Sequence, residues 1–191
     1  HRAVTGACLL GTINSFILFL NTKEMETQPL TSKEQMFVST DVMLRHWQGH
    51  RNLTRRVIEA FPEDKLFSHS IGGMRPFAHM VMEMIDIAEP GVKSLATGNW
   101  EKVEEFDHTK TMPQTKEGLL ERWDKVTALI DKTWPTIAPE RFQKVEIAFG
   151  QYENANYDTL FYFIDNEIHH RAQGYVYLRS LGIAPPFFWE R

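Results

Sequence analysis

Two histidines far apart in the chain, His79 and His170, are the residues best suited to carry chemistry. Neutral imidazole is the commonest side-chain ligand for transition metals in proteins. Glu83 follows His79 by four residues, and an asparagine, Asn166, precedes the second histidine by the same spacing. If both segments are helical, the two residues of each pair lie on one helix face. The pattern predicts a divalent-metal site between two helices, with one coordination position open as in catalytic centres.

Other side chains have supporting roles in this hypothesis. Glu83 is expected to bind the metal, to orient a ligand or to act as a catalytic base. Tyr177 falls on the same helical stripe as His170 and is a second catalytic candidate, at the mouth of the site. His50 lies near the inner face of an earlier helix and is a further candidate metal ligand. The alternative is that His79 and His170 are ordinary histidines of the core or its rim, and spacing alone leaves both interpretations open.

The helix that carries the second histidine is predicted from about residue 154 to 181. Gly182 suits the left-handed residue that ends a helix, and the two prolines that follow soon after prevent a restart. One stripe of this helix is apolar at both ends and polar in the middle, where Asn166 and His170 lie. Polar groups inside a helical protein cost free energy unless they are paired or bind a ligand, so the site is expected there.

Three earlier segments show the apolar spacing of amphipathic helices, and a fourth alternates as a strand does. The sequence therefore predicts all-α architecture, a four-helix bundle with one long crossover and a short extended segment or hairpin before the last helix. The predicted helices cover residues 32 or 39 to 61, 75–95 and 115–134, the crossover 96–114, and the hairpin falls within 141–156.

Composition limits the class of protein. The 191 residues are 42% hydrophobic, with a formal net charge of −4 and a single cysteine. These values suit a folded domain, and no basic block is present to bind nucleic acid. No apolar run approaches the ~20 residues of a membrane span. A single cysteine forms no disulfide within the chain, so we predict a cytoplasmic protein with neither nucleic acid nor membrane as partner.

The first 30 residues differ in character from the remainder. They hold one short apolar run, SFILFL at 15–20, with too few basic residues before it for a secretory signal. We interpret residues 1–30 as a leader or tail of separate origin, and residues 31–191 as the helical domain.

The last-helix segment NEIHHRAQ at 166–173, with YVYLRSLGIAPP at 175–186, resembles a signature of the DinB-like family. That signature has the form His-x-x-His-His-Arg-Gly-Gln and is followed by a Tyr-Leu-Arg-Leu-Leu-Gly ending. The segment GGMRPFAHMVME at 72–83 is similar to the His-x-x-x-Glu segment of the family's second helix. The resemblance extends over about residues 36–187.

This resemblance implies an up-down-down-up four-helix bundle, often dimeric, that holds a divalent metal such as nickel, zinc, manganese or iron through three histidines. His79 and His170 match the first and third of these ligands. Asn166 stands where the family has the middle histidine, and an amide oxygen is a poorer ligand for such metals than imidazole. The metal site is therefore expected to be weakened, to recruit His50 or Glu83, or to be lost.

From the resemblance we predict a divalent-metal-dependent enzyme, a thiol-dependent transferase or hydrolase that acts on a small thiol or other small molecule. Asn166 favours the alternative, a non-catalytic dimeric bundle with a degraded metal site that serves as a stress-related or small-molecule-binding module. A third interpretation, a carboxylate-rich metal site with Glu83 and Asp86, lacks the Glu-x-x-His pairing of such bundles. A second apolar flank on the last helix, which includes Ile164 and Ile168, favours a homodimer.

Overall fold

The structure is a computed structural model that describes residues 37–102 and 108–191. Its contacts divide the chain into two units, His1–Phe37 and Val38–Arg191, and every described helix and strand belongs to the second unit. The predicted leader at residues 1–30 lies outside the described residues.

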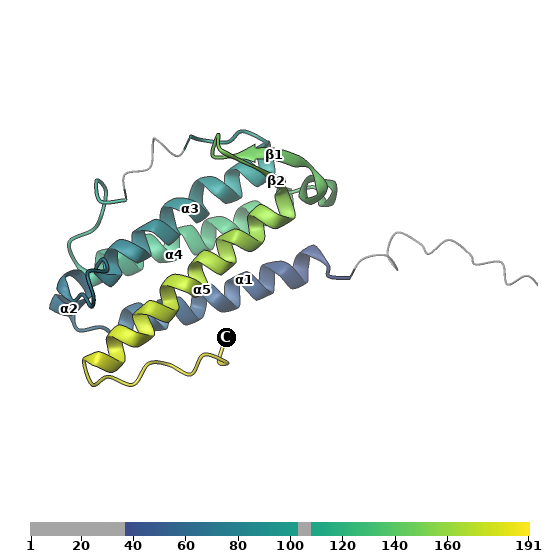
Figure 1. The fold of residues 1–191 in the computed structure, drawn as a ribbon. Helices are drawn as coiled ribbons and strands as arrows, with labels where there is room; N and C mark the ends of the chain where they lie inside the picture. The colour runs from purple at the N-terminus through teal and green to yellow at the C-terminus, as the bar shows by residue number, and fades with distance from the viewer. Residues whose placement is uncertain (1–36, 103–107) are drawn as a thin grey trace, which may run out of the picture. The chain divides into compact units, whose positions relative to one another are not determined.

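The second unit is mostly helical, which confirms the helical character predicted from the sequence, and a small antiparallel hairpin precedes the last helix (Figure 1). A short helix follows Pro62 directly, because proline ends one helix and is also well suited to start the next. The elements are α1 Thr40–Ala60, α2 Glu63–Ser68, α3 Phe77–Thr97, α4 Lys116–Thr133, two 3₁₀ turns at Trp134–Thr136 and Pro139–Gln143, β1 Val145–Ala148, β2 Tyr152–Ala155, and α5 Asn156–Ser180.

Short polar side chains and glycines set the helix ends. The Ser39 hydroxyl accepts the backbone N–H of Val42 at the start of α1, which selects the later of the two predicted starts. Thr115 caps α4 in the same way. Gly98 ends α3 with φ +81°, a backbone conformation that only glycine adopts without strain.

The long helices α1, α3, α4 and α5 enclose one hydrophobic core, and α5 packs against both α1 and α3 (Figure 1). Two glycines permit a close approach of α3 and α5. A Cβ atom at Gly91 of α3 would lie 2.6 Å from the Phe163 ring, and one at Gly174 of α5 would lie 2.5 Å from the Phe77 ring. Because α3 and α5 lie this close together, the polar side chains that face one another between them are within contact distance.

The predicted hairpin is confirmed between residues 145 and 155. Its strands pair antiparallel from Val145 with Ala155 to Ala148 with Tyr152. A three-residue turn, residues 149–151, joins the strands, and in it Phe149 and Gly150 have positive φ, +53° and +72°. The hairpin lies beside the N-terminal end of α5 (Figure 1).

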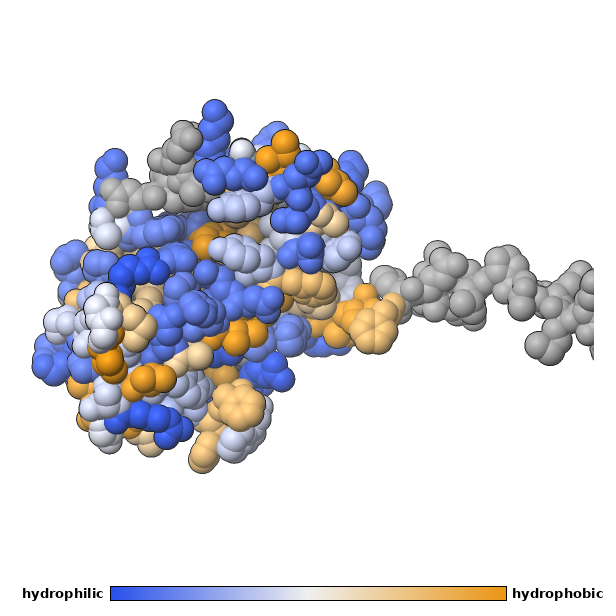
Figure 2. Space-filling view, viewed as in Figure 1, coloured by the Kyte–Doolittle hydropathy of each residue, from blue (hydrophilic) through white to orange (hydrophobic). Residues whose placement is uncertain are grey.

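The surface shows hydrophobic residues as separate groups among hydrophilic ones on the face seen in Figure 2. Among the helices that the structure describes, none combines the length and the apolar character that crossing a lipid bilayer requires.

Candidate functional site

A carboxylate of α3, Glu83, meets the polar stripe of α5. The Glu83 Oε1 atom lies 3.0 Å from Nε2 of His170. The same oxygen accepts a hydrogen bond of 3.2 Å from the amide nitrogen of Asn166. The structure thus joins three of the residues singled out from the sequence.

A residue that the sequence reasoning missed completes this group. The Arg75 guanidinium donates to Oε2 of Glu83. The hydrogen bond from His170, and that from Arg75, hold the pKa of Glu83 well below its usual range, although burial opposes them. Glu83 is therefore ionised at neutral pH, and Nε2 of His170 carries the proton it shares with this carboxylate. We name Glu83, Arg75, Asn166 and His170 the Glu83 cluster.

Tyr177 acts on this cluster indirectly. Its side chain is fully buried, and its hydroxyl donates a 3.0 Å hydrogen bond to the backbone carbonyl of Arg75. The structure places it beneath the Arg75 backbone, just before α3 begins. This hydrogen bond joins Tyr177 to the Arg75 backbone and not to a side chain of the Glu83 cluster.

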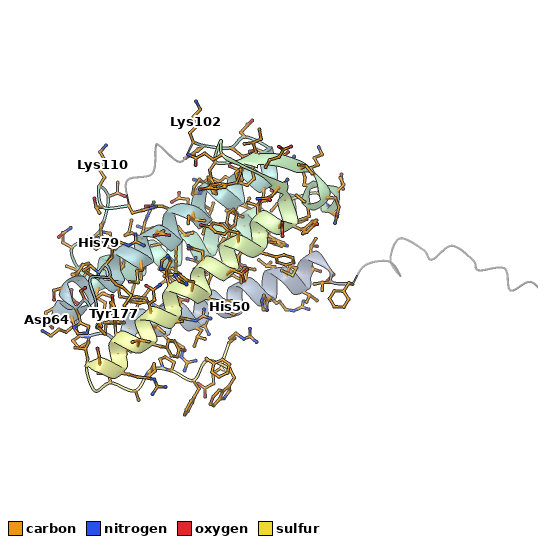
Figure 3. All side chains as sticks on the ribbon, in the orientation of Figure 1. His50, Asp64, His79, Lys102, Lys110 and Tyr177 are labelled. Atoms are coloured by element: carbon orange, nitrogen blue, oxygen red, sulfur yellow. The ribbon has the colours of Figure 1, made fainter. Side chains whose placement is uncertain are left out.

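His79 lies one helical turn before Glu83 on α3 and is half-buried (Figure 3). The two side chains therefore share one face of the helix. As placed, the acidic and imidazole groups of the Glu83 cluster pair with each other: within the described ranges, no three or more His, Cys, Asp or Glu side chains are arranged around a common metal position.

The donor chemistry of this region nevertheless fits the divalent metal that the resemblance implies. Two imidazoles and one carboxylate form a donor set used by catalytic zinc. Two atoms of the Glu83 cluster, Nδ1 of His170 and Oδ1 of Asn166, are buried without a hydrogen-bond partner in the described residues. Buried polar atoms are normally satisfied, so unpaired ones mark a place where a ligand gains free energy by binding.

The structure places His50 in different surroundings, on α1 (Figure 3). Its Nδ1 atom lies 2.9 Å from Arg171 and its Nε2 atom 3.1 Å from Arg191. Burial, followed by the neighbouring Arg171, His46 and Arg191, lowers the pKa of His50 to about 3. The ring is therefore neutral, both nitrogens face guanidinium groups, and the structure does not join His50 to the Glu83 cluster.

A second polar group, which the sequence reasoning did not assemble, lies between α1 and α5. The Glu167 carboxylate is 2% exposed, and the Thr54 hydroxyl donates to it at 2.9 Å. Arg51 approaches it to 3.6 Å and Arg171 to 3.9 Å. We name Arg51, Thr54, Glu167 and Arg171 the Glu167 cluster.

The sequence held a signal for this cluster. Arg51 and Thr54 fall on the apolar stripe of α1, where a charged side chain needs a buried partner. Glu167 and Arg171 form an i, i+4 pair of opposite charge on α5. Helical spacing predicts each pair separately but not their contact, because that contact depends on how α1 and α5 pack.

Solved structures share this fold, and a family model matches the sequence of this chain. The chain is similar to a DinB-like protein from Bacillus cereus ATCC 10987, at 17% identity and a TM-score of 0.65, over 81% of this chain and 100% of that one. It is also similar to the DinB-like protein YjoA from Bacillus subtilis, at 18% identity and a TM-score of 0.60, over 78% and 99%. No match was found among curated proteins. The family model described as the DinB family matches residues 36–190, and the chain therefore belongs to the DinB family.

Proposed function

We propose that this protein is a divalent-metal-dependent enzyme, a thiol-dependent transferase or a hydrolase, whose metal ligands are His79, Glu83 and His170. We also propose that the four long helices form an up-down-down-up bundle, as the resemblance implies. The observation that carries it is the 3.0 Å contact between Glu83 and His170 across α3 and α5. In the family motif a histidine occupies position 166, and in this chain Glu83 supplies the missing third donor.

The lowered pKa of Glu83 favours metal binding over a role as catalytic base. A carboxylate that stays ionised because His170 and Arg75 stabilise its charge is a weak proton acceptor at neutral pH. The same permanent negative charge suits a ligand to a divalent cation. We therefore assign Glu83 to metal binding. Arg75 orients this carboxylate, and Tyr177 holds the Arg75 backbone.

A divalent ion held by these residues would supply Lewis-acid chemistry, lowering the pKa of a bound thiol or water. His79, Glu83 and His170 would hold this ion. The amide nitrogen of Asn166 donates to Glu83 and would keep the carboxylate oriented.

The test is metal content, measured by mass spectrometry on protein purified without a histidine tag or added metal. The expected result is about one equivalent of nickel, zinc, manganese or iron, lost in His170→Ala and in Glu83→Gln. The matched control is His169→Ala, because His169 is the exposed neighbour of His170 and contacts Gln173 on the surface. Equal metal content in His170→Ala and His169→Ala would contradict the assignment.

A specific observation favours a second candidate, a non-catalytic dimeric bundle without metal. The Glu83 carboxylate already has hydrogen-bond partners in His170, Asn166 and Arg75. A carboxylate paired in this way needs no metal ion to offset its burial. In that case metal is absent from the wild type, and chelator leaves the free energy of unfolding unchanged. The metal content of the wild type distinguishes the two candidates. Restoring the family residue with Asn166→His tests whether His79 and His170 are in place as ligands, since it should then raise metal affinity.

A further inference from the structure

A cleft lies between the hairpin and the first turns of α5, away from the Glu167 cluster. Its volume is about 460 Å³, enough for a small organic molecule. Ala148 and Phe149, both buried, form part of its wall. We call it the hairpin cleft.

Aromatic rings line much of the hairpin cleft. Tyr152 comes from β2, and Phe161 and Tyr162 come from α5. These three side chains are 53%, 44% and 53% exposed, so their rings are open to solvent or to a ligand. Exposed aromatic rings gathered at one concave place differ from the scattered apolar residues that are normal on a surface.

The charge of the cleft has one sign. Asp158 and Asp165 of α5 belong to its lining, and no Lys, Arg or His does among the residues that the structure describes. Within residues 37–102 and 108–191, neither aspartate takes part in an ion pair or a side-chain hydrogen bond. Within the described residues, no side chain of the protein neutralises the negative charge of the cleft.

Another lining residue has an unsatisfied polar atom. Thr159 is 4% exposed, and its buried hydroxyl has no hydrogen-bond partner in the described residues. A buried hydroxyl normally bonds to something, often to the carbonyl of the preceding helical turn. This unpaired group, one residue from Asp158, is a second sign that the cleft is built to receive a ligand.

We propose that the hairpin cleft binds a small organic cation free in solution, a quaternary or tertiary ammonium compound. An ammonium group is attracted to the faces of aromatic rings, most strongly when several surround it. The two aspartates add attraction for positive charge, and a neutral ligand lacks this charge–charge attraction. An anion is excluded by the same two carboxylates.

This site is separate from the proposed metal position and does not depend on it. Tyr162 lies one helical turn before Asn166, so the hairpin cleft opens beside the Glu83 cluster on the same helix. Burial raises the pKa of Tyr162, and the nearby Glu83 and Tyr152 raise it further, so its phenol stays neutral. No side chain of the Glu83 cluster lines the cleft, so a cation bound there would lie near that cluster without contacting it.

The test uses choline as the probe and 3,3-dimethylbutan-1-ol as its uncharged isostere. Binding is followed by two-dimensional amide NMR of the whole chain, which also reports where each compound binds. Choline is expected to bind with a dissociation constant on the order of 1 mM, as suits a small ligand in an open cleft. The isostere is expected to bind at least several-fold more weakly. Equal binding of the two, or no choline binding well above that concentration, would overturn the proposal.

Two substitutions and one control assign the binding to the cleft. Tyr162→Leu removes a ring face and is expected to weaken choline binding roughly two- to tenfold. Asp158→Asn removes one charge and is expected to weaken choline but not the isostere. Glu153→Gln is the matched control, because Glu153 lies between Tyr152 and Asn154 on β2 and points to the opposite face of the hairpin. If all three variants bind choline like the wild type, the cleft is not the site.

The source of the ammonium group is tested separately. Sedimentation with phosphatidylcholine vesicles asks whether the same chemistry is presented by a lipid headgroup. The proposal expects choline binding without cosedimentation. Cosedimentation that choline competes away would replace the free cation with a membrane lipid and overturn this part of the proposal.

Discussion

Replacement of Glu167 by glutamine tests how α5 is held against α1. Burial lowers the pKa of Arg51 only to about 10, so this guanidinium remains protonated at neutral pH. Arg171 is also buried and charged. Glu167 is the carboxylate placed between them, and Glu167→Gln removes its charge while keeping its shape. Burial raises the pKa of Glu167, but two guanidinium groups and the Thr54 hydroxyl favour its ionised form.

The expected cost is large because two buried cations lose their counter-ion. At an effective dielectric constant of about 20, unit charges 3.6 Å apart attract each other by about 4–5 kcal/mol. Delocalisation over the guanidinium reduces that value, and the desolvation of both ions is already complete in the folded state. Removal of one partner from a buried pair typically costs about 3–5 kcal/mol, and we expect Glu167→Gln to fall in that range.

The assay is urea denaturation followed by tryptophan fluorescence and circular dichroism at pH 7. The matched control is Glu59→Gln, which breaks an i, i+4 ion pair with Arg55 in which both side chains are about one-third exposed or more. Such a pair contributes about 0–1 kcal/mol. In thermal denaturation the cost at Glu167 corresponds to a decrease in midpoint of roughly 6–20 °C. If Glu167→Gln loses no more stability than Glu59→Gln, Glu167 is protonated in the folded protein and the reasoning is refuted.

Three further predictions concern packing and pH. Gly174→Ala places a methyl group 2.5 Å from the Phe77 ring, and we expect a loss of about 1–3 kcal/mol in urea denaturation, whereas an ordinary Gly→Ala change within a helix is stabilising. The hydrogen bond from Arg141, with lesser ones from Trp100 and Asn156, lowers the pKa of Glu146 from 4.5 to about 2. Its contribution to stability is therefore present above pH 4.5 and lost as the pH falls from 4.5 toward 2, and Glu146→Gln should flatten the stability profile in that window. The pKa of His50 falls from 6.5 to about 3 on folding, so the free energy of unfolding should decrease as the pH falls below 6.5. His50→Gln should lose less of this free energy than the wild type between pH 6.5 and 5. Glu146 stays ionised in that range and does not contribute to the difference.

The elements that the sequence predicted well are those fixed by local rules. Ser39 and Thr115 are side-chain caps, and Gly150, which has positive φ, interrupts the strand pattern at the hairpin turn. Each of these effects involves residues within four positions of one another. Local spacing also placed Asn166 and His170 on one stripe of α5, where both meet Glu83.

The remaining parts depend on packing between distant segments. Arg75 escapes prediction because it precedes α3 in a loop, and its importance appears only when its guanidinium turns back to Glu83. His50 is a candidate site residue in the sequence because it lies near the inner face of α1. That face is shared by two environments, and packing assigns His50 to Arg171 instead of Glu83. A helical wheel identifies a buried face without identifying which neighbour covers it.

The two polar clusters are linked through the rotation of α5. Glu167 follows Asn166, and Arg171 follows His170, so each residue of one cluster is displaced by about 100° around the helix from its neighbour in the other. With Glu167 held between Arg51 and Thr54 of α1, this displacement directs Asn166 and His170 toward α3 and Glu83. A rotation of α5 by one residue would bring His170 toward α1 and leave the Arg51 guanidinium of α1 without its carboxylate. The buried charges therefore set the orientation of the candidate site without touching it. For the same reason, Glu167→Gln should weaken binding at the Glu83 cluster in the fraction of molecules that remains folded.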